Sequence, residues 1–330
     1  MVKWIEIDTY EKLIIWLNNG NNINEKNNYG ETLLHYLCQN DCSVEKMSLL
    51  IENGANINKR NMYGETPLHF LCKNNCENNC LVEQMSLLIE NGANVNERNN
   101  YGETPLHYLC YRKNSIEAIS LLIENDVDIH EKTNNGCNVL HFLCKYNSSI
   151  EKISLLIENG VNVNEKSNYG NTPLHFLCQN DCSLEKMSLL IENGANINKR
   201  NMYGNTPLHF LCKNNCLVEQ MSLLIENGAN VNERNIKGET PLHYLCQNNC
   251  SIEAISLLIE NGANVNEKIF YNETPLHYLC RYKSQGRYES QALIDPKKFI
   301  EQINLLIRKG ANINKKNNDG HIPVSYTHLT

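Results

Sequence analysis

The stretch Gly64-Glu65-Thr66-Pro67-Leu68-His69-Phe70-Leu71-Cys72 returns, with small variations, along almost the whole chain of 330 residues. Its copies begin at Gly30, Gly64, Gly102, Gly136, Gly170, Gly204, Gly238 and Asn272. Neighbouring copies lie 34 residues apart, except for one interval of 38 residues. A second phrase, Leu50-Ile51-Glu52-Asn53-Gly54-Ala55-Asn56-Ile57-Asn58, recurs in phase with the first. A fixed period of roughly 20–50 residues is typical of stacked repeats, so we expect one repeat array rather than the two or three domains that the length suggests.

Each repeat contains the signals for two helices and a connecting loop. Thr66 offers the hydroxyl of a helix N-cap and Pro67 suits the first helical position, which predicts a short first helix. The second helix is predicted to begin at Ser43 or its equivalent, and Gly54 can take the left-handed conformation that ends it. Residues 55–64 alternate apolar and polar side chains and are rich in Asn and Gly. They predict an extended, hairpin-like loop before the next pair of helices.

The two phrases, Gly-x-Thr-Pro-Leu-His and Leu-Leu-Ile-x-x-Gly-Ala-Asn-x-Asn, resemble the ankyrin repeat over residues 10–323. The departures are a period of 34 rather than about 33, Leu-Cys in place of paired alanines, and Asn where the family often has Asp. The resemblance implies an all-α repeat solenoid of stacked helix-turn-helix units with projecting β-hairpin loops. It also implies a curved, ligand-accepting concave side.

The repeat phase divides the chain into segments. We expect an N-terminal capping half-repeat over residues 1–26, with apolar side chains that cover the stack, and eight tandem repeats over residues 27–316. The start of a truncated ninth repeat follows over residues 317–323, and residues 324–330 abandon the pattern. An insertion of 14 residues lies between the two helices of the eighth repeat, within Arg281 to Lys298.

The fourth repeat departs most from the others. Asp126 stands where the others have the glycine that ends the second helix, and Asn138-Val139 replaces Thr-Pro. A left-handed Asp costs on the order of 1 kcal/mol relative to Gly. We therefore expect amide hydrogens of residues 126–145 to exchange faster than those of the repeats beginning at Gly170 and Gly204.

Two blocks of the chain are near copies. Residues 38–76 and 178–216 differ only at Val44/Leu184 and at Glu65/Asn205. Such duplication lengthens a binding scaffold without adding chemistry, whereas a catalytic site would not be multiplied in this way. The copying therefore favours a non-enzymatic protein.

The resemblance implies a structural role for the histidine of each repeat, which hydrogen-bonds loop backbone and locks neighbouring repeats together. These histidines are His35, His69, His107, His141, His175, His209, His243 and His277. The cysteines of the same phrase are expected to be free, packed thiols. Two alternatives stay open: the spacing of His69, Cys72 and Cys76 would allow zinc, and the second row of thiols would allow redox sensing. We expect no metal and no cofactor.

The loop tips are the candidate partner-binding residues, because they vary most between repeats and carry Tyr, Arg and apolar side chains, which are enriched at interface hot spots. The candidates are Tyr29, Met62, Tyr63, Tyr101, Tyr169, Met202, Tyr203, Ile236, Phe270 and Tyr271. The structural alternative is that each tyrosine packs on the neighbouring loop with no partner involved. The basic insertion between Arg281 and Lys298 is a second candidate contact site.

Charge and composition exclude other classes of partner. The net charge of −7 gives no electrostatic footprint for nucleic acid. No apolar run approaches the ~18 residues of a membrane helix, and acidic residues near Met1 interrupt any signal peptide. We expect a monomeric protein of the cytoplasm, with the nucleus also open, and no membrane insertion.

The leading functional hypothesis is a non-enzymatic scaffold that binds another protein through its concave face and loop tips. The sequence contains no phosphate-cradling glycine loop, no Gly-x-Ser-x-Gly elbow and no His-Glu-x-x-His motif. The alternative is a substrate-recruiting arm of a larger multidomain protein, for example a ubiquitin-ligase adaptor, whose effector module would lie beyond the present C-terminus.

The final residues, Val324-Ser325-Tyr326-Thr327-His328-Leu329-Thr330, generate a prediction of their own. They are what GTC TCT TAT ACA CAT CTG ACG encodes, which resembles a transposase-end adaptor of sequencing libraries. We expect that they are not native and that the protein continues with a ninth helix pair. Sequencing of genomic DNA at this locus tests the prediction, and recovery of these codons there would contradict it.

Overall fold

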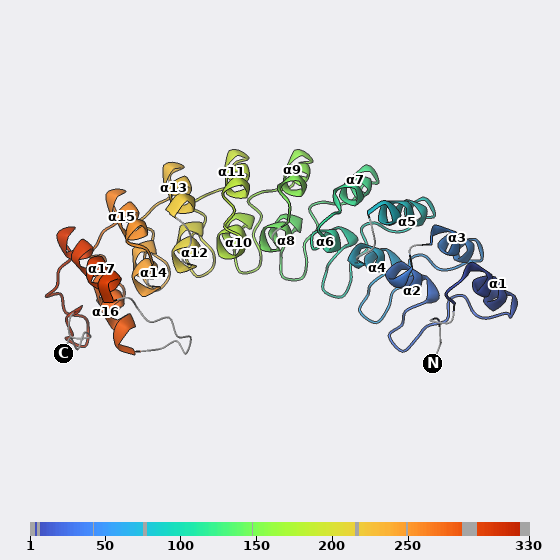
Figure 1. Ribbon diagram of the computed structural model, residues 1–330, viewed down its shortest axis with the longest axis horizontal. Coiled ribbons are helices and arrows are strands. Elements are labelled where there is room, and N and C mark those ends of the chain that lie inside the picture. The colour runs from blue at the N-terminus through green and yellow to red at the C-terminus, as the bar shows by residue number, and fades with distance from the viewer. Residues whose placement is uncertain are drawn as a thin grey trace. The chain divides into compact units, whose positions relative to one another are not determined.

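The computed structural model describes residues 4, 7–41, 43–74, 78–146, 148–214, 218–248, 250–285 and 296–323. The tail at 324–330 and most of the insertion after Arg281 lie outside the described residues. The chain forms two compact units, Met1–Asn168 and Tyr169–Thr330, and each is described by itself (Figure 1).

The first unit contains nine helices among its described residues. They are α1 (Tyr10–Asn18), α2 (Leu33–Asn40), α3 (Val44–Glu52), α4 (Pro67–Lys73), α5 (Asn78–Glu90), α6 (Pro105–Leu109), α7 (Ile116–Glu124), α8 (Val139–Lys145) and α9 (Ile150–Glu158). The described part of the second unit contains α10 (Pro173–Asn180), α11 (Leu184–Glu192), α12 (Pro207–Lys213), α13 (Val218–Glu226), α14 (Pro241–Gln247), α15 (Ile252–Glu260), α16 (Pro275–Gln285) and α17 (Pro296–Arg308). The helical repeat architecture implied by the sequence is confirmed.

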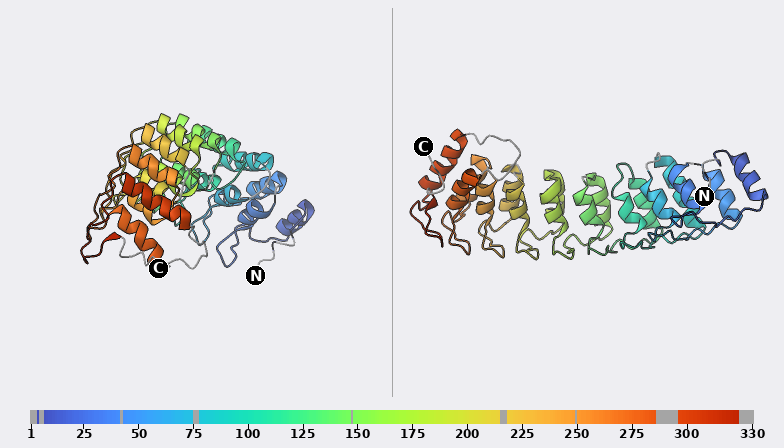
Figure 2. Two further views of the ribbon diagram at one scale, coloured as in Figure 1. Left: turned by 60° about the vertical axis from the view of Figure 1, so that its left-hand side comes forward. Right: turned by 90° about the horizontal axis from the view of Figure 1, so that it is seen from below.

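Within each unit the helices form two rows (Figures 1 and 2). First helices pack on first helices, as α4 does on α2 and α6, and second helices on second helices, as α5 does on α3 and α7. The loops extend on the side of the first helices. The core between the rows is built from fully buried side chains such as Met47, Leu50, Leu68 and Leu71, which one helix pair alone would leave in water.

The first residues of the chain contribute to this core only in part. Helix α1 packs on α3, and Trp4, Ile7 and Leu13 are buried. Ile14 and Ile15, two of the apolar side chains in the expected capping half-repeat over residues 1–26, are exposed.

The loops are tight turns, and the described residues contain no β-strand, so the expected hairpins lack paired strands. The Asn61 amide donates to the Glu65 carbonyl at 2.9 Å, and Gly64 closes the turn with a φ of 78°. A Cβ at Gly64 would lie 2.9 Å from the backbone nitrogen of Asn100 in the next loop. Glycine is therefore required at this position both for its φ and for the close approach of neighbouring loops.

An asparagine ladder joins consecutive repeats and accounts for part of the 55 asparagines in the chain. The Asn58 side chain donates to the Gly92 carbonyl at 2.8 Å and accepts from the Asn94 amide at 2.8 Å. The same pair of bonds is made by Asn24, Asn96, Asn198, Asn232 and Asn266. Each amide thus satisfies one carbonyl at the end of a second helix and one N–H of the following loop.

Buried histidines form a second connection between repeats. The Thr66 amide donates to Nδ1 of His69 at 3.1 Å, so the ring proton lies on Nε2, which donates to the Glu103 carbonyl at 3.2 Å. His35, His175, His209 and His277 reach the carbonyls of Glu65, Asn205, Glu239 and His321 in the same way. In His107 and His243 only the Nδ1 half of this arrangement is complete among the described residues.

In the fourth repeat, Asp126 and Asn138-Val139 were both expected to weaken the structure, and the expectation was wrong for Asn138. The Oδ1 of Asn138 accepts from the His141 amide at 3.3 Å, so Asn138 replaces the threonine as a helix cap. Asp126 keeps the backbone strain, with a φ of 58°. Its carbonyl still accepts the ladder bond from Asn96.

The strain at Asp126 predicts the effect of a substitution. Asp126→Gly should raise the free energy of unfolding by about 1 kcal/mol, because glycine takes a positive φ without a Cβ penalty. Urea denaturation and amide exchange measure the change. The matched control is Gly160→Asp, at a φ of 88° with open space around the missing Cβ, which should cost a similar amount. Equal stability of all three proteins would contradict the prediction.

The histidines predict a loss of stability in mild acid. Burial lowers the pKa of His35, His69, His107, His209 and His243 to about 4. The unfolded chain, with a pKa of about 6.5, binds protons first, so the stability present above about pH 6.5 is lost as the pH falls toward 4. Between pH 7 and pH 5 each buried histidine should lower the free energy of unfolding by about 2 kcal/mol.

Urea denaturation at pH 7 and pH 5 tests this. His209→Gln should reduce the pH dependence by the share of one histidine, whereas His130→Gln, at an exposed loop position, should leave it unchanged. Equal stability of the unchanged chain at both pH values would show that the histidines do not control acid unfolding.

Candidate partner-binding surface

The ten tip residues predicted from the sequence are all exposed in the structure. Their exposed fractions range from 41% at Tyr63 to 68% at Phe270 and Tyr271. Tyr29, Met62, Tyr63 and Tyr101 belong to the first unit, and Tyr169, Met202, Tyr203, Ile236, Phe270 and Tyr271 to the second. Large apolar side chains are thus held in water at the turn of loop after loop.

The backbone of these tips is fixed by hydrogen bonds between loops. The Met62 amide donates to the Tyr29 carbonyl at 2.9 Å, and Met202 donates to Tyr169 at 3.0 Å. The carbonyls of Tyr63, Tyr101, Tyr203 and Tyr271 accept equivalent bonds from Asn100, Asn134, Ile236 and Asn318. Since the bonds use main-chain atoms, the tip side chains themselves are not needed for this connection.

The loop arginines, which the sequence suggested as hot-spot residues together with tyrosine, have a structural role instead. Arg60 pairs with Glu97 at 3.0 Å and donates through its other terminal nitrogen to the Arg98 carbonyl at 3.0 Å. Arg98, Arg200 and Arg234 make the same two contacts with the following loop. The available signal for this ladder was an arginine in one loop followed by a glutamate in the next loop, one position earlier in the repeat.

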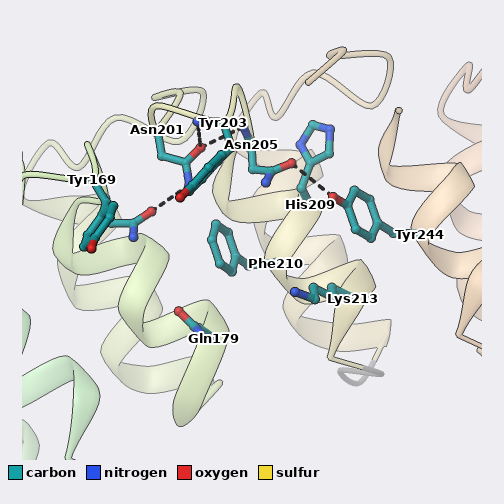
Figure 3. A pocket seen from close by; sticks show the side chains of 10 residues that line it. Tyr169, Gln179, Asn201, Tyr203, Asn205, His209, Phe210, Lys213 and Tyr244 are labelled. Carbon is teal, nitrogen blue, oxygen red and sulfur yellow. Dashed lines mark hydrogen bonds between the residues drawn. The ribbon is translucent and has the colours of Figure 1, made fainter. Parts of the chain in front are cut away.

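A pocket of about 240 Å³ lies in the second unit, between two loop tips and the first helices (Figure 3). Tyr169 and Tyr203 form its rim, and Phe210 of α12 lies on the helix side of them. It is also lined by Asn171, Gln179, Asn201, Asn205, His209, Lys213 and Tyr244. The structure therefore brings two of the predicted tip residues together with helix residues that the sequence did not single out.

Hydrogen bonds fix the polar wall of this pocket. Asn201 donates to the Asn171 side chain at 2.8 Å and its Oδ1 accepts from the Asn205 amide at 3.0 Å. The Tyr244 hydroxyl donates to Asn205 Oδ1 at 3.4 Å, a long bond. Lys213 is exposed, and no residue in the described part of the chain forms an ion pair with it.

The cysteines of the repeat phrase are packed inside the stack. These cysteines are Cys38, Cys72, Cys110, Cys144, Cys178, Cys212, Cys246 and Cys280, and all of them are buried. Burial raises the pKa of the Cys110 thiol to about 12, which keeps it protonated and unreactive. Among the described residues no group of three or more His, Cys, Asp and Glu side chains could hold a metal ion. Cys76, one of the three residues of the zinc hypothesis, lies outside the described residues.

No helix in the described ranges is both long enough and apolar enough to cross a membrane.

Comparison with known families gives one result that covers most of the chain. A family model described as "Ankyrin repeats (3 copies)" matches residues 6–82, 64–133, 109–201, 140–235, 184–269 and 208–317. No curated protein matches the chain significantly. The overlapping matches extend over the helices, loops and pocket described above.

Proposed function

Because the chain belongs to the ankyrin repeat family, whose repeats generally mediate protein–protein interactions, we propose that it is a non-enzymatic scaffold for another protein. The proposed contact surface consists of the loop tips and the adjoining first helices. The observation that carries the proposal is the set of ten exposed apolar and aromatic tip side chains on loops whose backbones are fixed.

Two physical arguments support this surface. Apolar groups at exposed tips reduce solubility, and Asn could occupy the same turns, so their recurrence suggests contact with a partner. The loops are held by the backbone, asparagine and arginine ladders, so that little conformational entropy is lost on binding.

The buried histidines favour a role without catalysis. Desolvation holds the pKa of His69 and His209 at about 4, so they are neutral at physiological pH. Both ring nitrogens already have partners in the stack. These rings are therefore poorly placed to exchange protons with a substrate. The family is typically non-catalytic.

A site of action inside the cell fits the thiols. No disulfide joins any of the twelve cysteines of the described residues. Thiols in this number suit a reducing compartment, and the proposal therefore places the protein in the cytoplasm or nucleus.

Substitution of the tips tests the proposed function. Replacing Tyr101, Met202, Tyr203 and Phe270 together by Asn should abolish capture of partner proteins in pull-down experiments, because truncation of an aromatic hot spot commonly costs ~2 kcal/mol or more. The melting temperature should change by only a few degrees, since the loop-to-loop bonds use main-chain atoms.

The matched control replaces two other exposed apolar residues, Ile15→Gln in α1 and Ile300→Gln in α17. This variant should capture the same proteins as the unchanged chain. A collapse of the melt in the fourfold variant would identify the tips as packing residues, and unchanged capture would exclude them as the contact surface.

A further inference from the structure

The near-identical blocks at residues 38–76 and 178–216 differ at two positions, and one of them lies in the pocket. Where the first block has Glu65, the second has Asn205. The sequence around these two positions is otherwise the same. The two sites therefore show the effect of exchanging a single side chain, Glu for Asn.

In the first unit, Glu65 occupies the site with its own carboxylate. Its Oε1 accepts from the Tyr108 hydroxyl at 2.8 Å, and its Oε2 accepts from Asn61 Nδ2 at 3.0 Å. The Lys73 ammonium lies 3.6 Å from Oε1 and 5.8 Å from the centre of the Tyr108 ring. One carboxylate thus satisfies a tyrosine, an amide and an ammonium at once.

The eighth repeat has an acid and a cation at the positions that correspond to Glu65 and Lys73. Glu273 pairs there with Arg281, whose Nη1 lies 2.8 Å from each carboxylate oxygen. In both repeats the glutamate therefore forms an ion pair with the basic residue eight positions further along the chain.

In the second unit, the acid is missing while the lysine that would pair with it remains. Lys213 corresponds to Lys73 and Tyr244 to Tyr108. The shorter, neutral Asn205 accepts from Asn235 Nδ2 at 3.1 Å and from the Tyr244 hydroxyl at 3.4 Å. It leaves Lys213 without an ion pair among the described residues. The pocket opens between these groups.

We propose that this pocket binds the carboxylate of an Asp or Glu side chain presented by the partner protein, with Lys213 as its counter-ion. This inference rests on the proposed function and names the chemistry that one part of the surface recognises. The partner supplies the acid that Glu65 supplies within the chain at the equivalent position.

Size and surroundings fit such an occupant. A volume of about 240 Å³ is smaller than the roughly 300–1,000 Å³ of small-molecule sites, which suits one or two side chains of a peptide. Tyr169, Tyr203 and Phe210 offer aromatic area to the residues beside the acid. The pocket wall carries neutral amide side chains at Asn171 and Asn205. An Asp or Glu of the protein at either position would repel an acidic ligand.

The charged groups around the pocket favour a carboxylate ligand over a phosphate. The Glu239 carboxylate is already engaged by Asn235 at 2.9 Å, by Tyr278 at 2.8 Å and by the Tyr244 hydroxyl. The lining contains one lysine and no arginine, whereas phosphopeptide sites use clusters of arginine. A single carboxylate is therefore the better match.

The first experiment selects peptides from a phage-displayed library of random dodecamers on the intact chain and on Asn205→Glu. The introduced carboxylate should reach Lys213 and Tyr244, as Glu65 reaches Lys73 and Tyr108. We expect Asp and Glu to be enriched at one peptide position with the unchanged chain and not with the variant. Absence of acidic enrichment with the unchanged chain would overturn the inference.

The second experiment measures affinity with a fluorescently labelled peptide from that selection. Its Glu→Gln or Asp→Asn counterpart, and Lys213→Gln in the protein, should each weaken binding by about tenfold, and added salt should weaken it further. The matched control is Lys73→Gln, which removes a lysine already paired with Glu65 and should leave the affinity unchanged. Equal effects of the two lysine variants would contradict the assignment.

A gain of function completes the test. The double variant Glu31→Asn and Glu65→Asn gives the first unit the amides that the second has at Asn171 and Asn205. It should bind a second equivalent of the acidic peptide, and an unchanged stoichiometry would count against the role of the missing acid.

The outcomes separate this inference from the proposed function. If selected peptides depend on Tyr169 and Tyr203 but show no acidic preference, the scaffold function stands and the carboxylate pocket fails. If acidic peptides bind and Asn205→Glu removes them, while the fourfold tip variant still captures every partner, the pocket stands and the wider tip surface fails.

Discussion

The rest of the structure depends on the buried histidine of the repeat, whose Nδ1 accepts the amide at the start of its helix in all eight described repeats. In five of these repeats Nε2 also reaches the loop of the next repeat. The His69 ring receives the Thr66 amide at the start of one helix and donates to the Glu103 carbonyl of the following loop. It thereby joins a helix cap to the stacking of neighbours. The two bonds together require a neutral ring, because Nδ1 can accept from the Thr66 amide only when it carries no proton. Burial favours the neutral ring by lowering the His69 pKa to about 4.

The loops show how stacking and recognition use different atoms. Main-chain groups, ladder asparagines and loop arginines hold each loop against the next, as Asn58 and Arg60 do. The side chains of Tyr169 and Tyr203 take no part in these bonds and form the rim of the pocket. A rigid support with variable contact groups is the arrangement that favours tight binding at low entropic cost.

The helices and the exposed tips could be predicted from the sequence, because the Thr-Pro cap and the glycine stops are local signals. The absence of strands in the described loops was not predicted. Each loop bonds to its neighbour through single main-chain contacts, such as the one from Met62 to Tyr29, rather than through a strand ladder. The pocket was also missed. The Glu65/Asn205 difference gains meaning only when Lys73 and Tyr108, 8 and 43 residues further along the chain, are seen to meet at Glu65.

The asparagine ladder has a consequence for how such a chain changes over generations. An amide offers a donor and an acceptor, so a junction built on it is the same between any two repeats that carry it. Asn58 and Asn198 make the same set of bonds at two separate junctions, and Asn266 makes it before the repeat that carries the long insertion. Unequal recombination can therefore lengthen or shorten the array without creating a mismatched junction. Selection is then free to act on the tip residues one at a time.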